Sequence, residues 1–252
     1  MKKFEYTPPE QPRELILKLG QKITDRIGHT VTAEDPEYYG LEALVTDEMA
    51  EVALKMKVRK PMTLAQAVKA TGKEEKVLEE LLQEMSNIGL LEYNWENPKH
   101  EKQYVLPMYV AGSAEFFNMK LDQIKEHPEV ASFFERMAFL PLQKVTPMVP
   151  PGGAGIGMHV IPVEKAIETE NESVSVEHIS HWLDKYDGKY AAGPCSCRYS
   201  RGVLGEGCAD DPEDWCIGVG DMADYLVETN KGHYITREKV MEILQRAEDN
   251  GF

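Results

Sequence analysis

The amino-acid sequence predicts an α+β chain, mainly helical, that is built in two parts. Between about residues 37 and 107, three segments with helical spacing of apolar residues are followed by a stretch in which apolar residues alternate. A run rich in proline and glycine, residues 147–158, then interrupts the pattern. All four cysteines lie beyond this run, between Cys195 and Cys216. We therefore expect a winged helix-turn-helix-like domain, followed by a small helical domain that carries the cysteines.

These signals divide the chain into four stretches. Residues 1–36 form an N-terminal arm and a helix, and residues 37–146 form the winged-helix-like domain with additional helices. Residues 147–158 are a Pro/Gly linker, and residues 159–252 form the cysteine-bearing domain. A hydrophobic content of 42% is enough for a packed core.

Apolar residues at three- and four-residue spacing predict the helices of the first part. One helix runs over residues 14–27, and a second apolar face begins after Gly40. Thr63 caps a short helix that ends at Gly72, and a further helix covers residues 74–87. The positions expected to face inward are Leu15, Leu19, Ile23 and Ile27; Leu41, Leu44, Val45, Val52 and Met56; Leu64, Ala67 and Val68; and Val77, Leu78, Leu81, Leu82 and Met85.

Past Gly89, which ends the last of these helices, the apolar period changes to two. Residues 91–95 alternate between apolar and polar, residues 97–100 form a turn, and residues 104–106 alternate again. This pattern predicts a β-hairpin. Three helices followed by a hairpin are the order of a winged helix-turn-helix domain.

Further elements are expected on both sides of the linker. They are helices over residues 113–124 and 128–137, a short strand over residues 159–163, and helices over residues 175–186, 217–229 and 236–249. The cysteines lie in the loop between the helices at 175–186 and 217–229.

The four cysteines follow the pattern C-x-C-x10-C-x7-C, formed by Cys195, Cys197, Cys208 and Cys216. Four thiols confined to one short segment favour a metal centre over a dispersed disulfide framework. Iron–sulfur clusters and structural zinc both take four thiolates. Zinc sites usually pair cysteines as C-x2-C, whereas this chain has one C-x-C and two single cysteines. The glycines around the cysteines, with Arg198 and Arg201, also suit an anionic cluster, so we favour iron–sulfur and keep zinc as the alternative.

The same segment resembles a family of 4Fe-4S-binding proteins from anaerobic metabolism. The similarity lies in the C-x-C-R at 195–198, the glycine-bearing loop to Cys208, the Pro-Glu-Asp-Trp-Cys turn at 212–216, and the final Ile-Thr and Ala-Glu-Asp-Asn-Gly at 235–251. The resemblance implies that Cys195, Cys197, Cys208 and Cys216 bind the cluster, and that a winged-helix-like region precedes it. Members of the family occur as free electron-transfer proteins, or are fused to or encoded with flavin and nicotinamide oxidoreductases. Serine between the first two cysteines departs from the family pattern, and relatives continue beyond the position of Phe252, so we expect a piece of a longer polypeptide.

A cluster held by four cysteines has no open iron for a substrate, so its chemistry is electron storage. No flavin or nicotinamide fingerprint is present, and neither is a Ser/His/Asp set or a P-loop. We therefore expect an electron-transfer component rather than a stand-alone catalyst, with a flavin/NAD(P)-dependent oxidoreductase or another redox protein as its partner. Homo-oligomerisation is left open. The alternatives are a zinc- or cluster-containing winged-helix transcription regulator and a structural assembly module.

A formal net charge of −15 argues against partners that are nucleic acids or anionic membranes. The helix at the recognition position, residues 73–86, holds five glutamates against two lysines, which opposes entry into a DNA groove. The chain has no secretion signal and no long apolar run, so we expect a cytoplasmic protein.

Other features favour ordinary structural roles. The glycines at 153–157 lack the spacing of a phosphate-binding loop and predict a connector. His178 and His181 are expected to face solvent, and the acidic run 206–214 to provide solubility. For Trp215, shielding of the cluster and core packing both stay open.

Overall fold

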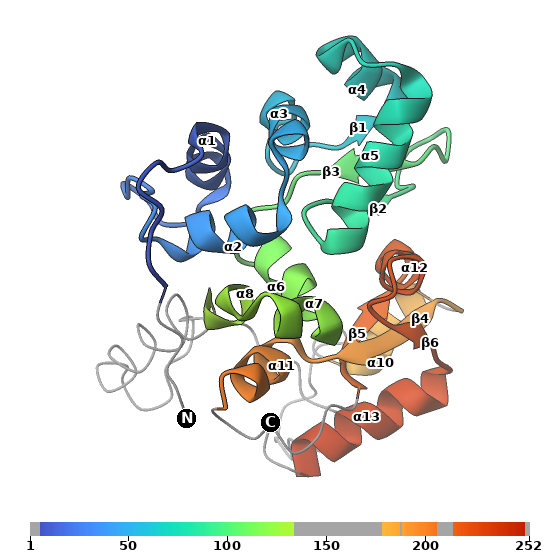
Figure 1. Cartoon of the computed structure of the whole chain (residues 1–252). Coiled ribbons are helices and arrows are strands. Elements are labelled where there is room, and N and C mark those ends of the chain that lie inside the picture. The colour runs from blue at the N-terminus through green and yellow to red at the C-terminus, as the bar shows by residue number, and fades with distance from the viewer. Residues whose placement is uncertain (1–5, 134–177, 187, 206–213, 250–252) are drawn as a thin grey trace.

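The computed structural model describes residues 6–133, 178–186, 188–205 and 214–249, and it is a mixed α and β structure (Figure 1). The helices among these residues are α1 (Glu14–Ile23), α2 (Pro36–Leu44), α3 (Asp47–Lys55), α4 (Leu64–Thr71), α5 (Glu75–Ile88), α6 (Ser113–Asn118), α7 (Leu121–Glu126), α8 (Pro128–Phe133), α10 (Ile179–Lys185), α11 (Ser196–Val203), α12 (Asp221–Glu228) and α13 (Arg237–Asp249). The strands are β1 (Met62–Thr63), β2 (Glu92–Asn94), β3 (Gln103–Val105), β4 (Tyr190–Pro194), β5 (Asp214–Val219) and β6 (His233–Tyr234). The predicted linker and the strand expected at 159–163 lie outside the described residues.

The first sheet is antiparallel, with the strand order β1-β3-β2. The hairpin predicted at 91–106 is present as β2 and β3, in which Tyr93 is opposite Tyr104. The third strand, β1, precedes α4 and pairs Met62 with Tyr104. Along the chain, helices α4 and α5 therefore come after the first strand of this sheet and before its hairpin.

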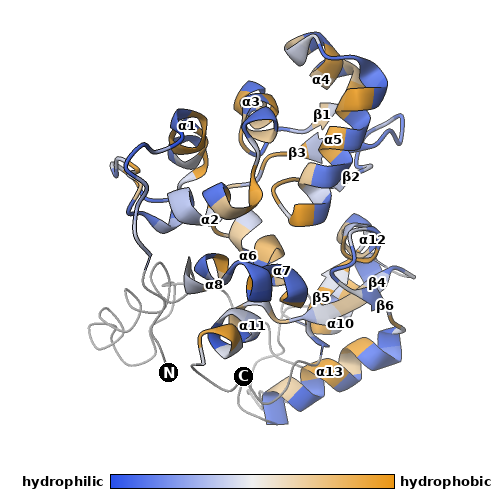
Figure 2. Ribbon diagram, in the orientation of Figure 1, coloured by the Kyte–Doolittle hydropathy of each residue, from blue (hydrophilic) through white to orange (hydrophobic). Residues whose placement is uncertain are grey.

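Local capping sets the ends of α4 and α5 as the sequence predicts. The Thr63 hydroxyl accepts from the Gln66 amide, and the Gln66 side chain accepts from the Thr63 amide, so the two form a capping box. Gly72 and Gly89, which follow α4 and α5, both have positive φ, as a left-handed helix end requires. In Figure 2, α5 is hydrophobic on one side and hydrophilic on the other.

Several predicted helical details are wrong. Helix α1 ends at Ile23, and Ile27 is fully exposed in the loop that follows. Val77 is 51% exposed rather than inward, because the buried face of α5 is formed by Leu78, Leu81, Leu82 and Met85. The apolar face after Gly40 belongs to two helices, since Thr46 ends the first stretch and caps α3 by accepting from the Met49 amide. The single helix expected at 113–124 is likewise divided into α6 and α7.

The second part contains a sheet that the sequence does not predict. Its strand order is β5-β4-β6, and both pairings are antiparallel. The helix expected over 217–229 is wrong at its start, because Ile217 to Val219 belong to β5. Gly220 has φ +60° and turns the chain into α12. A left-handed glycine at this point is incompatible with a helix that continues through it.

The two predicted parts share one hydrophobic core. Tyr225 of α12 lies edge-on to Tyr93 and Phe116, with ring centroids 5.1 and 4.9 Å apart. Its buried hydroxyl donates to the Leu91 carbonyl at 2.8 Å. Lys231, which is 1% exposed, follows α12 in sequence and contacts the end of α5. The cysteine-bearing segment is therefore packed directly on the first part.

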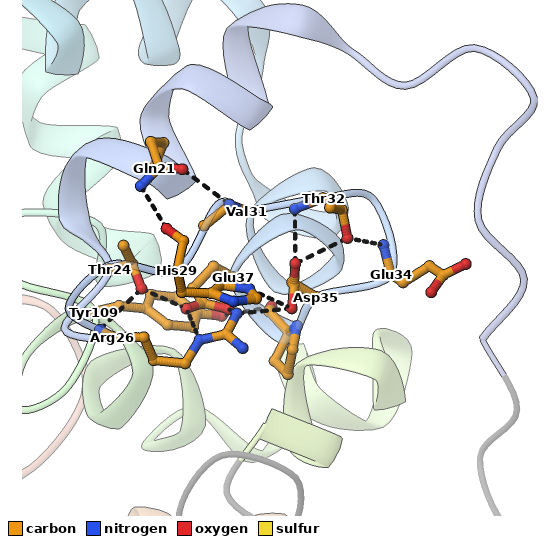
Figure 3. Close-up of polar contacts among 11 residues, drawn as sticks. Gln21, Thr24, Arg26, His29, Val31, Thr32, Glu34, Asp35, Glu37 and Tyr109 are labelled. Atoms are coloured by element: carbon orange, nitrogen blue, oxygen red, sulfur yellow. Dashed lines mark hydrogen bonds and ion pairs between the residues drawn. The ribbon is translucent and has the colours of Figure 1, made fainter.

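A buried carboxylate fixes the loop between α1 and α2 (Figure 3). Glu37 is 0% exposed and accepts from the Thr24 hydroxyl at 2.6 Å and from the guanidinium of Arg26 at 2.8 and 2.5 Å. The same guanidinium reaches Asp35 at 2.8 Å, and the His29 ring lies 2.9 Å from that carboxylate. The loop itself therefore supplies the hydrogen bonds and the positive charge that compensate the buried carboxylate of Glu37.

Replacing Glu37 by glutamine is expected to lower the free energy of unfolding by about 2 kcal/mol. The amide keeps the shape of the side chain but removes the charge that the Arg26 guanidinium faces, and it turns an NH2 group toward other donors. Urea unfolding measures the change. Glu14→Gln is the control, because Glu14 pairs with Lys18 on the open surface of α1 and should leave stability unchanged. Equal unfolding midpoints for the two variants would contradict the assignment.

Candidate metal centre

Two segments bring three of the four predicted cysteines together. Cys195 follows β4 and is the residue before α11, and Cys197 lies in the first turn of that helix. Cys216 is on β5, directly opposite Gly193 of β4. Because the strand pairing brings β5 beside the chain that leads to Cys195, residues far apart in sequence meet at the start of α11. Cys208 lies outside the described residues.

The described thiols interact through Cys195. Hydrogen bonds from the Cys197 thiol and then from the Cys216 thiol lower the pKa of Cys195 far below its usual range. Donating to Cys195 raises the pKa of both of its partners. For Cys197 we attribute the shift to this hydrogen bond rather than to burial, because the residue is exposed. The three thiols are free, and Cys195 interacts with both of the others.

Main-chain amides at the start of α11 lie near the thiols. The N–H groups of Arg198 and Cys197 help to lower the pKa of Cys195, and the N–H of Ser196 acts in the same direction on Cys216. The Arg198 amide itself donates to the Cys195 carbonyl at 3.1 Å, as expected in the first turn of a helix. Amide donors close to sulfur are also what thiolates bound to a metal require.

The donor set fits a metal centre with four thiolates, but the described part does not complete one. Among residues 6–133, 178–186, 188–205 and 214–249, no three histidine, cysteine or acidic side chains are arranged to hold an ion. Cys195 interacts with both of the other described thiols, and Cys208 lies outside the described residues.

Strands β4 and β5, which lead to the cysteines, have two local irregularities: a close approach of two backbone segments and a β-bulge. A Cβ atom on Gly193 would lie 2.2 Å from the Lys231 carbonyl oxygen, so only glycine fits this position of β4. The pairing is irregular after Gly193, because Cys216 is opposite Gly193 whereas Pro194 is opposite Asp214. Trp215 is the extra residue of this bulge, which directs neighbouring side chains to new positions.

Two arginines stack on Trp215 beside the cysteines. The Arg198 guanidinium carbon lies 4.4 Å from the ring centroid, and that of Arg246 lies 4.1 Å from it. Arg246 also donates to the Asp214 carbonyl at 2.9 Å. Trp215 is half-buried and packs against cations rather than in the apolar core. The sequence indicates Arg198 as a cation near the cysteines, because it follows Cys197 directly. It does not indicate Arg246, since the one hint is a charged residue on the inward side of α13.

The remaining sequence candidates do not join the site. His178 precedes α10 and His181 lies within it, and both are half-buried rather than fully solvent-facing. Asp214, at the end of the acidic run, lies 3.1 Å from the His233 ring. The glycines at 153–157 lie outside the described residues.

Comparison of the chain with protein-family models, curated proteins and solved structures found no match. Among the described helices, none combines the length and the apolar character that crossing a membrane requires.

Proposed function

We propose that Cys195, Cys197, Cys208 and Cys216 bind one [4Fe-4S] cluster, and that the chain transfers electrons as a component that partners a flavin- or NAD(P)-dependent oxidoreductase. The observation that carries the proposal is the meeting of Cys195, Cys197 and Cys216 where β4 leads into α11 and β5 lies alongside. When bound, such a cluster would store and pass one electron.

The residues around the thiols have definable roles in this proposal. The main-chain N–H groups of Ser196 and Cys197 lie near the sulfurs and favour thiolate, and the guanidinium groups near Trp215 offset negative charge. The three described cysteines are free thiols, which in their deprotonated form are metal ligands. Because no internal donor is implied, the electron must come from a separate redox protein or domain.

Zinc is the second candidate, and the closeness of the thiols favours it. Four thiolates around one zinc ion lie about 3.8 Å apart, given a Zn–S bond of about 2.3 Å. The cysteines of a cubane are bound to four separate irons and lie further apart. Thiols that hydrogen-bond to one another, as Cys195 does to Cys197 and Cys216, are nearer to the first spacing.

A winged-helix regulator is less well supported. The order α3, β1, α4, α5, β2, β3 is the one expected of a winged helix-turn-helix domain. However, the helix at the recognition position, α5, exposes Glu75, Glu79, Glu80 and Glu84. That face would be repelled by DNA phosphates, so we infer a scaffold or protein-docking role for this domain. A gel shift with random duplex DNA at moderate salt should show no complex.

The deciding experiment is the ultraviolet–visible spectrum of anaerobically purified protein, with iron, sulfide and zinc counted. Broad brown absorption, near-equal iron and sulfide, and a paramagnetic signal after dithionite support the cluster. Stoichiometric zinc without iron overturns the electron-transfer proposal and leaves a structural site.

Cys208→Ser tests the fourth ligand. We expect the variant to lose the brown absorption and most of its iron, because three thiolates cannot complete the ligand set. Lys239→Ala is the control, since Lys239 pairs with Glu242 on the surface of α13 and its replacement leaves all four thiols in place. Unchanged colour and iron content in Cys208→Ser would contradict the ligand assignment.

A further inference from the structure

The C-terminal helix α13 reaches the residues that directly precede Cys216. Its apolar side packs against the second sheet through Val240, which is buried in the same cluster as Tyr190 of β4, and Ile243 of the helix is also buried. Arg246 lies three residues after Ile243, at a position where helical spacing predicts another side chain that faces inward. Here the helix places a guanidinium rather than an apolar side chain against the start of β5.

Arg246 makes two contacts with consecutive residues of that strand. Its Nη2 atom donates to the Asp214 carbonyl at 2.9 Å, and its guanidinium lies over the Trp215 ring, 4.1 Å from the centroid. A guanidinium can stack and donate in its plane at the same time, which an ammonium cannot. The two contacts hold both the backbone and the side chain just before Cys216.

Arg246 contacts β5 at the point where the pairing of β5 with β4 is irregular. Trp215 is the bulged residue and has no opposite partner on β4. The same ring also stacks on Arg198, whose own amide donates to the Cys195 carbonyl at 3.1 Å. The ring of Trp215 therefore connects the segment that carries Cys195 and Cys197 with the segment that carries Cys216.

We propose that Arg246 is a positioning residue of the thiol site, which sets the place of Cys216 relative to Cys195 through the Asp214 carbonyl and the Trp215 ring. The C-terminal helix is then part of the site, although its residues are far from the cysteines in sequence. The consequence for metal retention depends on the proposed function, but the placement of Cys216 does not.

Alkylation of the metal-free protein by iodoacetamide, followed peptide by peptide with mass spectrometry, tests the placement. In Arg246→Ala we expect Cys216 to react about tenfold faster relative to Cys197, the change that corresponds to losing one hydrogen bond of typical strength. A purely electrostatic role predicts the opposite sign, because loss of a nearby cation disfavours the reactive thiolate. General loosening of the fold would accelerate Cys195 as well, which is half-buried like Cys216, so an unchanged ratio of Cys216 to Cys195 alkylation identifies that outcome and contradicts the proposal.

Arg237→Ala is the matched control, since Arg237 lies on the same helix and pairs with Asp184 at 2.8 Å. Its ratio of Cys216 to Cys197 alkylation should stay within twofold of the parent chain. If Arg246→Ala does not fold, Arg246→Lys compared with Arg237→Lys decides, because lysine keeps the charge and loses the planar stack. An equal ratio in the Arg246 and Arg237 variants overturns the proposal.

The same variants, loaded with iron and sulfide, separate this proposal from the proposed function. Release of iron to a chelator should be about tenfold faster in Arg246→Ala than in Arg237→Ala, a loss within the range seen when a residue that supports metal ligands is removed. If the parent chain takes up no metal but the alkylation ratio changes as expected, the positioning role stands and the metal proposal fails. If metal binds and neither readout distinguishes the variants, the positioning role is wrong and the metal proposal stands.

Discussion

Gly193→Ala is expected to lower the free energy of unfolding by about 3 kcal/mol, at the upper end of the usual cost of overpacking. The added Cβ would lie 2.2 Å from the Lys231 carbonyl oxygen and 3.0 Å from the methyl carbon of Met119. The carbonyl cannot move away easily, because the Lys231 amide is held by the Leu226 carbonyl at 2.7 Å. Strand β4 must therefore shift away from the turn that contains Lys231.

The shift has a second consequence, because Cys195 lies two residues beyond Gly193. Movement of β4 should separate the Cys195 sulfur from Cys197 and Cys216, and any metal bound there should be lost. Urea unfolding and metal analysis measure the two effects. Gly20→Ala is the control: its nearest atom is a Val31 methyl carbon at 3.3 Å, and alanine inside α1 should be neutral or stabilising by up to about 1 kcal/mol. A Gly193→Ala variant as stable as the parent would show that the close approach is not rigid.

The elements that could be predicted from the sequence are those with local signals. Thr63, Gly72 and Gly89 mark the ends of α4 and α5 through contacts made within a few residues. The hairpin was predicted for the same reason, since its alternation and its turn are continuous in sequence. Ile27 and Val77 were misplaced because spacing alone cannot show which side of a helix meets the core.

The second sheet could not be predicted because its causes are distant in sequence. Residues 217–219 were joined to the following helix, and their pairing with β4 depends on residues 190–193. Gly218 and Gly220 were the available signal, since two glycines weaken a helix and the second requires positive φ. The clustering of the cysteines was visible in the sequence, but the bulge, Arg246 and Lys231 depend on tertiary contacts.

The buried amine of Lys231 is expected to make stability rise with pH. Its Nζ atom donates to the Ser86 and Asn87 carbonyls at 2.9 and 3.0 Å and lies 4.9 Å from the Tyr225 ring centroid. The Lys120 ammonium shares the Asn87 carbonyl at 3.2 Å, and among the described residues no carboxylate contributes to the pKa of Lys231. Burial, and then the charge of Lys120, lower the pKa of Lys231 to about 6.

The sign follows from the protons bound in each state. In the unfolded chain the Lys231 amine keeps its proton up to a pKa of about 10.4. In the folded chain it has lost that proton above its pKa of about 6. The destabilisation is therefore complete below pH 6 and disappears as the pH rises toward 10.4. Between these values each pH unit should add about 1.4 kcal/mol to the free energy of unfolding.

Lys231→Met isolates this contribution, because methionine keeps an unbranched apolar stem and removes the titrating group. Between pH 7 and pH 9, the free energy of unfolding of the parent chain should rise by about 2.7 kcal/mol relative to the variant. Urea unfolding at three pH values measures the difference, and Lys239→Met, on the surface of α13, should follow the parent chain. A constant difference between parent and Lys231→Met would mean that the amine stays charged when folded. In that case the two carbonyls at the end of α5 would outweigh the cost of burial, and Lys231 would act as a charged cap of that helix.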